Sequence, residues 1–212
     1  MPKLIVFDLD GTLIDSRLDL AGAVNYMRGS MGLEPLDTAR IVRFVGSGAA
    51  ALVRRAIADS EIDFDEAYKR MRTFYFDHIT DTTVLYPGVP AGLKQLKESG
   101  ARLAVVTNKP GAETEKILTQ LEVKTYFSDI IGGDADFPLK PEPDALLFLK
   151  KKYALTDRDC WMVGDHHTDL ESGRKANFRR IFVTYGFGEK GEETPDYTAD
   201  NFSDVNLILS GF

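Results

Sequence analysis

The sequence predicts an α/β fold, a doubly wound parallel sheet with an inserted four-helix cap domain. Two observations carry this prediction. Short apolar runs alternate along most of the chain with segments of helical periodicity, the order of elements in a parallel sheet covered by helices. One long stretch near the N-terminus breaks this alternation, because its apolar residues recur only at helical spacing.

The predicted strands are short runs of β-branched and apolar residues that end at a polar residue or a glycine. They lack the polar–apolar alternation of a half-exposed strand, so they fit strands that are buried on both faces. These runs are Leu4–Phe7, Leu103–Val106, Ile130–Ile131, Trp161–Val163 and Ile181–Val183.

The predicted helices lie between these runs and end at recognisable stop signals. They cover Val89–Ser99, Ala112–Leu121, Pro143–Tyr153 and Thr168–Ala176. Gly100 follows the first helix and Asn177 follows the last. Glycine, and after it asparagine, most readily adopts the left-handed conformation that ends a helix.

The stretch from residue 15 to residue 83 predicts the helical insertion. Apolar residues such as Tyr68, Met71 and Tyr75 recur there three and four positions apart. The expected division is a core of residues 1–14 and 84–212 and a cap of residues 15–83. An insertion after the first strand lies over the carboxyl ends of the strands, where ligands bind, so we expect it to act as a lid.

Composition and charge exclude several classes of protein. The 212 residues carry a net charge of −7, which argues against a nucleic-acid partner. No apolar run is long enough for a membrane span, and the single cysteine, Cys160, allows no intramolecular disulfide. We therefore expect a cytoplasmic protein, a monomer or a homodimer, with no nucleic-acid or membrane partner.

The first predicted strand runs into Asp8-Leu9-Asp10-Gly11-Thr12. Alternate residues of an extended segment point the same way, so Asp8 and Asp10 can face one site. Two neighbouring carboxylates can divide the work between a nucleophile or metal ligand and an acid–base catalyst. The alternative is an acidic turn that caps the next helix.

Three later strand ends carry further polar residues. Thr107 and Asn108 can donate hydrogen bonds to phosphate oxygens, although both residue types are also common in turns and helix caps. Lys140 can neutralise a phosphate as a point charge, although most single lysines are surface residues. Asp165 and Asp169 offer the hard oxygen ligands that suit Mg²⁺.

The order of these residues resembles the four motifs of the haloacid dehalogenase superfamily. Those motifs are aspartate-x-aspartate, threonine or serine, lysine, and glycine-aspartate-x-x-x-aspartate, and each follows a predicted strand here. The resemblance covers essentially the whole chain, and it implies a Rossmann-like core and a covalent aspartyl-phosphate. The second aspartate of the first motif favours a phosphatase over a dehalogenase, since a halide needs no proton.

The resemblance implies a role for each motif residue. Asp8 would be the nucleophile, and Asp10 the general acid and then the general base. Thr107 and Asn108 would bind the phosphoryl group. Lys140 would balance charge and orient the nucleophile.

The same resemblance implies Mg²⁺ as the cofactor. Its ligands would be Asp8, the backbone carbonyl of Asp10, and Asp165. Asp169 would bind the ion through a water molecule or support the other ligands.

The cap resembles that of phosphoglycolate phosphatases around Val45-Gly46-Ser47-Gly48 and Arg55, and the later Tyr185–Gly188 segment is also similar to that group. A glycine loop can present backbone N–H groups to an anion, and Arg55 can bind a carboxylate with two hydrogen bonds. Gly46, Ser47, Gly48 and Arg55 are therefore the expected substrate contacts of the cap. The alternative is that the glycines only form a turn between helices.

We therefore expect a magnesium-dependent phosphatase that acts on a small phosphate ester such as phosphoglycolate. A pyrophosphatase, a nucleotidase and a sugar-phosphate phosphatase are alternatives on the same scaffold. A catalytically silent binding protein is an alternative of a different class. His166 and His167 beside Asp165 fit either a transition-metal site or simple exposure near the lid.

Overall fold

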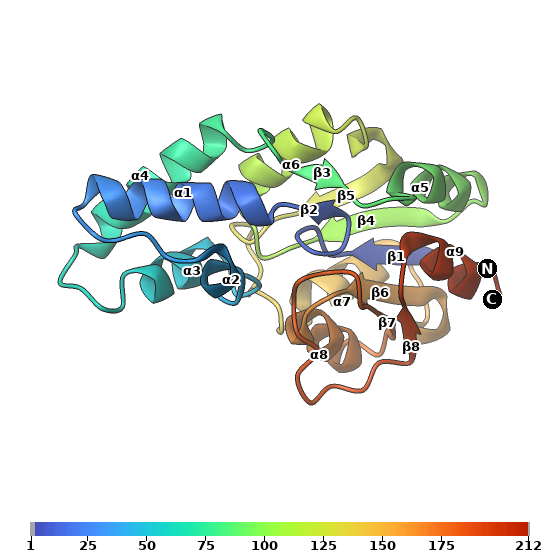
Figure 1. Ribbon diagram of the computed structural model, residues 1–212. Helices are drawn as coiled ribbons and strands as arrows, with labels where there is room; N and C mark the ends of the chain where they lie inside the picture. Colours follow the sequence, from blue (N-terminus) through green and yellow to red (C-terminus); the bar gives the residue numbers. More distant parts are fainter. Residues whose placement is uncertain (1–2, 212) are drawn as a thin grey trace.

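In the computed structural model, a parallel sheet lies between two layers of helices, and a further group of helices stands at one end (Figure 1). The structure describes residues 3–211. Within them the main sheet has six strands in the order β5–β4–β1–β6–β7–β8, and all neighbouring pairs are parallel. The strands are β1 Leu4–Phe7, β4 Arg102–Val106, β5 Phe127–Ile131, β6 Cys160–Gly164, β7 Arg179–Val183 and β8 Tyr197–Ala199.

Strand β1 lies inside the sheet because both of its faces are apolar. Ile5 and Phe7 belong to the core on one side of the sheet, and Leu4 and Val6 to the core on the other. All four side chains are buried, which explains why the run shows no polar alternation.

Helices cover both faces of the sheet. In Figure 1 α5 and α6 lie on one side, and α7 and α8 on the other. Helix α9 shares the core of α5. Their bounds are α5 Val89–Glu98, α6 Gly111–Gln120, α7 Asp144–Lys152, α8 His167–Lys175 and α9 Phe202–Ser210. Two short 3₁₀ turns, Lys124–Tyr126 and Asp157–Asp159, lead into β5 and β6. The predicted doubly wound sheet is confirmed.

The order of the strands places a site at the end of β1. From β1 the chain adds β4 and β5 on one side and then returns to add β6, β7 and β8 on the other. The chain therefore leaves β1 toward one edge of the sheet and β6 toward the other edge. The place between these two strands is the switch point of the sheet. Ligands of open α/β sheets bind in the crevice that this separation leaves at the carboxyl ends of the strands.

Among the described residues, four helices come between β1 and β4 in the sequence, before α5. Figure 1 shows them at the carboxyl ends of the strands, in blue to teal. They are α1 Arg17–Ser30, α2 Thr38–Val42, α3 Ala49–Ala56 and α4 Phe64–Asp77. We call this group the cap. The division of the chain into two domains at the predicted boundaries stays a prediction. Within residues 3–211 no helix is long and apolar enough to cross a membrane.

Between the first strand and the helix that begins at Val89, the sequence shows no convincing strand, but the structure has two short strands there. Strand β2, Ile14–Asp15, pairs antiparallel with β3, Val84–Leu85, where the chain leaves and re-enters the core. Each strand has only two residues, so neither is long enough to display a period in the sequence.

Candidate active site

The carboxyl ends of the central strands bring the predicted motif residues together. Asp8 follows β1, Thr107 follows β4, Asp165 follows β6, and Lys140 precedes α7. Asp8 and Lys140 are 8% and 5% exposed, so these charges lie in a largely dry site. Adjacent parallel strands end at the same edge of the sheet, which explains how residues so far apart in the sequence meet there.

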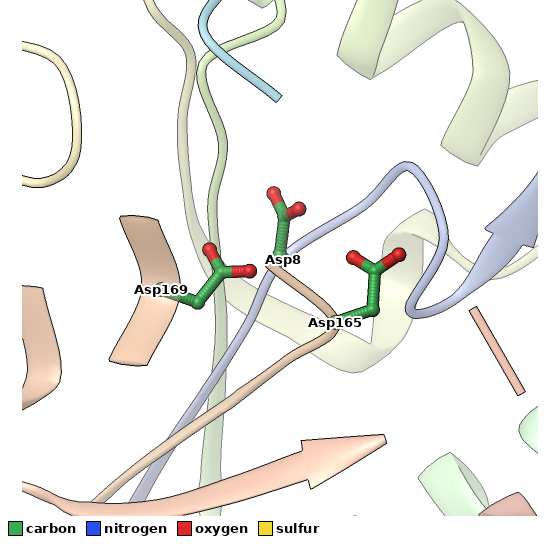
Figure 2. Close-up of side chains that lie close together, drawn as sticks. All are labelled: Asp8, Asp165 and Asp169. Atoms are coloured by element: carbon green, nitrogen blue, oxygen red, sulfur yellow. The ribbon is translucent and has the colours of Figure 1, made fainter. Parts of the chain in front are cut away.

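Three buried carboxyl groups form a cluster that can hold a cation. Asp8, Asp165 and Asp169 each offer an oxygen, and these oxygens lie within 4.8 Å of one another. Figure 2 shows the three groups gathered around a common space. Burial, and then the neighbouring carboxylates of Asp169 and Asp8, raise the pKa of Asp165 well above its ordinary value. A divalent cation would offset this repulsion, so the cluster fits one.

A glycine-rich loop after β7 holds Asp165. The backbone N–H groups of Phe187 and Gly188 donate to Asp165 Oδ2 at 3.0 and 2.7 Å. Gly11 passes close by with a φ of +84°, and a Cβ there would lie 1.9 Å from Asp165 Oδ2. Only glycine fits at position 11, which accounts for that residue after the two aspartates.

Lys140 connects the nucleophile candidate to the fourth motif. Its Nζ donates to Asp8 Oδ1 at 2.9 Å, to Asp169 Oδ1 at 2.6 Å and to the Val106 carbonyl at 2.7 Å. Burial alone would lower the pKa of Lys140, but the carboxylates of Asp169 and Asp8 raise it above its ordinary value. Burial raises the pKa of Asp8 to about 6, and the Lys140 ammonium opposes that rise. The ammonium therefore orients Asp8 and favours its ionised form.

The Asn108 side chain is bound to backbone groups. Its Nδ2 donates to the carbonyls of Gly46 and Lys140 at 2.9 Å each, and its Oδ1 accepts from the Lys140 N–H at 2.9 Å. Asn108 thus joins β4, the Lys140 loop and the cap. Its predicted contact with a phosphoryl group would need the amide to leave these partners. The hydroxyl of Thr107 accepts from the Lys109 N–H at 3.3 Å and keeps its own hydrogen for a ligand.

Asp10 is held by two groups, one of which the sequence analysis missed. Ser16 Oγ donates to Asp10 Oδ1 at 2.5 Å, and Lys109 Nζ donates to Oδ2 at 2.8 Å. Lys109 is 7% exposed, and its Nζ lies 4.7 Å from the centre of the Tyr75 ring on α4. A cation directly after Thr107-Asn108 at a strand end was the signal that could have identified it.

The cap and the core enclose a pocket over these groups. Its cap side is mostly apolar, with Leu20, Val45, Ala49, Leu52 and Met71 in the wall. Its polar walls contain Asp8, Asp10, Thr107, Asn108, Lys109, Asp165, His166, Arg72, Tyr75 and Glu113. Gly46, Gly48, Phe187 and Gly188 also line it.

Of the four cap residues predicted to contact the substrate, only the two glycines line this pocket. Gly46 has a φ of +107°, and a Cβ there would lie 2.7 Å from His166 Nε2. The loop therefore packs directly on the core. Ser47 and Arg55 lie outside the pocket wall, where the exposed Arg55 guanidinium donates to the Phe44 carbonyl at 2.7 Å and to Ser47 Oγ at 3.1 Å. In this position Arg55 braces the loop.

The two histidines differ in their surroundings. His166 lines the pocket, and burial lowers its pKa to about 4, so it is neutral at pH 7. Its Nδ1 lies 3.0 Å from Thr168 Oγ1. His167 packs its ring against that of His166, with centres 4.1 Å apart, and is not part of the pocket wall. Neither belongs to the carboxylate cluster found among the described residues.

Comparison with known proteins identifies the class to which this fold and site belong. Residues 5–183 match the model of the haloacid dehalogenase-like hydrolase family. The chain therefore belongs to this family, as the order of its motifs predicted.

Named relatives give a narrower similarity. The chain is 37% identical to phosphoglycolate phosphatase 1 of Pseudomonas aeruginosa, over 97% of this chain and 79% of the relative. It is also 37% identical to the phosphoglycolate phosphatase of Chromobacterium violaceum, over 99% and 97% of the two chains. A crystal structure of a predicted phosphoglycolate phosphatase from Haemophilus somnus superposes with a TM-score of 0.93 at 31% identity, covering 98% and 97%. These findings indicate a phosphatase.

Proposed function

We propose that this chain is a magnesium-dependent phosphatase that hydrolyses phosphoglycolate or a similar small acidic ester through an aspartyl-phosphate on Asp8. The observation that carries the proposal is the bond from Lys140 Nζ to Asp8 Oδ1, made beside the cluster of Asp8, Asp165 and Asp169. One oxygen of Asp8 is oriented by the ammonium, and the other is available to attack. The names of the relatives support phosphoglycolate as the substrate.

The first half of the reaction would break the ester. An Asp8 oxygen forms a bond to phosphorus while the bond from phosphorus to the ester oxygen breaks. Asp10 gives its proton to that oxygen, and the alcohol leaves. The Thr107 hydroxyl and the Lys140 ammonium stabilise negative charge on the phosphoryl oxygens during the transfer.

The second half would restore the enzyme. Asp10 takes a proton from water as the water oxygen attacks phosphorus, and the bond between phosphorus and the Asp8 oxygen breaks. Inorganic phosphate and free Asp8 result. Mg²⁺ held by Asp8, Asp165 and the Asp10 carbonyl would supply positive charge that offsets repulsion between the nucleophile and the phosphate dianion.

Two measurements test this function. The first is kcat/KM for phosphoglycolate against pyrophosphate, a nucleoside monophosphate and a sugar phosphate, with Mg²⁺ and with excess chelator. We expect phosphoglycolate to rank first and the chelator to stop turnover. The second is rapid acid quenching with ³²P-labelled substrate, which should trap a protein-bound label that hydroxylamine removes, because hydroxylamine cleaves acyl phosphates. Another ester ranking first would replace the substrate, and no turnover of any ester would favour the silent binding protein.

A further inference from the structure

The groups that bind a phosphoryl group cannot choose a substrate, because all phosphate esters share that group. Selection must come from residues that face the leaving side of the pocket. Among the described residues, Arg72 and Lys109 are the cationic side chains that line the pocket. His166 also lines it but is neutral. The surroundings of Arg72 and Lys109 decide which of them can receive an anion.

Arg72 is already engaged with an acid. Its Nε and Nη2 donate to Glu113 Oε1 at 2.7 and 2.5 Å. Glu113 is 2% exposed, and its second oxygen, Oε2, has no hydrogen-bond partner. An unpaired carboxylate oxygen at this place repels a second carboxylate. This part of the wall is therefore unsuited to an acidic leaving group.

Lys109 lies where such a group would end. Its Nζ is 2.8 Å from Asp10 Oδ2. A general acid works within about 3.2 Å of the oxygen that it protonates, so an ester oxygen bound to Asp10 lies within about 6 Å of the Lys109 Nζ. In phosphoglycolate the carboxyl carbon is two bonds from the ester oxygen, which brings the carboxylate within reach of Lys109. An ammonium has three donor hydrogens, so Lys109 can hold Asp10 and a carboxylate together.

Tyr75 supplies a second, independent observation. Its side chain is 4% exposed, yet its hydroxyl forms no regular hydrogen bond in the structure. The ring stands beside the Lys109 ammonium, with its centre 4.7 Å from Nζ. The Lys109 ammonium beside the phenol can only donate, so the phenolic hydrogen is left for a ligand oxygen.

We propose that Lys109 and Tyr75 bind a carboxylate on the leaving group, which makes Lys109 the residue that selects acidic substrates. This inference rests on the proposed function and moves the carboxylate contact from Arg55 to the end of β4. The cap contributes the phenol from α4 and the core contributes the ammonium. The carboxylate site is therefore complete only when the cap covers the core.

Binding of two matched phosphonates to the magnesium-loaded chain tests the proposal without turnover. 3-Phosphonopropionate has the length of phosphoglycolate with a methylene in place of the ester oxygen, and propylphosphonate lacks only the carboxylate. The ratio of their dissociation constants, from titration calorimetry, measures the carboxylate contact alone. We expect Lys109→Met to reduce this ratio about 10- to 100-fold, since a charge-assisted hydrogen bond to the carboxylate is lost. Lys94→Met, at an exposed lysine of α5, is the matched control and should leave the ratio unchanged.

Other variants keep the test decisive. Tyr75→Phe retains the ring and should lower the ratio several-fold; an unchanged ratio in this variant overturns the proposal even where Lys109→Met does not fold. Collapse of the ratio in Arg55→Ala instead of Lys109→Met would return the contact to the cap loop. A wild-type chain that shows no preference for 3-phosphonopropionate contradicts the substrate assignment itself. An unchanged ratio in Lys109→Met, in a chain that does show the preference, contradicts only the role of Lys109.

Discussion

At the scale of single residues, Lys140 sets the surroundings of Asp8, the proposed nucleophile. It contacts Asp8, Asp169 and the Val106 carbonyl at once, so one ammonium orients the Asp8 carboxylate and offsets the charge of Asp169. A lysine that is 5% exposed is tolerated there because two carboxylates surround it. The proposed chemistry follows from this small set of buried charges.

Replacing the nucleophile should abolish turnover. We expect Asp8→Asn to reduce kcat by several orders of magnitude, because the amide has the same shape but is a poor nucleophile. Steady-state assays with phosphoglycolate would measure this, and circular dichroism would check that the variant is folded. Retention of a tenth or more of wild-type activity would refute the aspartyl-phosphate on Asp8.

The two aspartates of the fourth motif should differ in metal binding. We expect Asp165→Asn to weaken apparent Mg²⁺ affinity about 10- to 100-fold, and Asp169→Asn to weaken it less. The reason is that Asp169 already pairs with Lys140 and accepts the His166 N–H at 3.0 Å. Activity as a function of free Mg²⁺ would measure both, with the exposed Asp136→Asn as a control. Equal effects of the two substitutions would make Asp169 a direct ligand.

At the scale of elements, the loop before α3 and the end of β4 form one contact. Asn108 donates to the Gly46 carbonyl, and the Gly46 backbone lies against the His166 ring. Gly46, which the sequence predicted to contact the substrate or else to form a simple turn, thus permits close approach of the cap to the core. Gly46 and Gly48 also line the pocket, so the same loop shapes its wall.

A side chain at position 46 should displace the loop. We expect Gly46→Ala to lower kcat/KM about tenfold or more, because its Cβ would lie 2.7 Å from His166 Nε2 and the φ of +107° disfavours alanine. Gly22→Ala in α1 is the control, since a Cβ there meets no atom within 4 Å. Unchanged activity in Gly46→Ala would show that the contact between loop and core is not needed for turnover.

At the scale of the whole molecule, the pocket exists only where the cap meets the sheet. The motif residues stand on the core, and most of the apolar wall comes from the cap. Arg72 of α4 and Glu113 of α6 form an ion pair across this boundary, with Glu113 buried and Arg72 half-buried. This pair links the position of the cap to the core helix that follows β4.

Removal of the pair should reveal coupling between cap and core. For Arg72→Met, Glu113→Gln and the double variant, we expect a coupling energy of about 1–3 kcal/mol in the free energy of unfolding. Denaturant unfolding would measure it. The exposed pair of Lys94 and Glu98, 3.9 Å apart, is the control and should show a coupling energy close to zero. No coupling between Arg72 and Glu113 would mean that this ion pair does not hold the cap to the core.

The sequence by itself determined the alternation of strands and helices, and it singled out the motif residues that the structure gathers at one edge of the sheet. Both are largely local properties, since burial on two faces produces an apolar run, and Asp8, Thr107 and Asp165 each directly follow a strand. Elements with weak local signals were missed. Strand β8 has three residues at the sheet edge, and β2 and β3 have two each, too few to show a period.

Only the tertiary structure showed which cation lines the pocket. The sequence favoured Arg55 and gave no attention to Lys109, because nothing local to either residue reports how the cap docks. In the fold, the Gly46 loop packs on Asn108 and turns Arg55 outward, while Lys109 leaves β4 directly into the pocket beside Asp10. The make-up of the pocket wall therefore depends on contacts between segments far apart in the chain, which local periodicity and motif order do not encode.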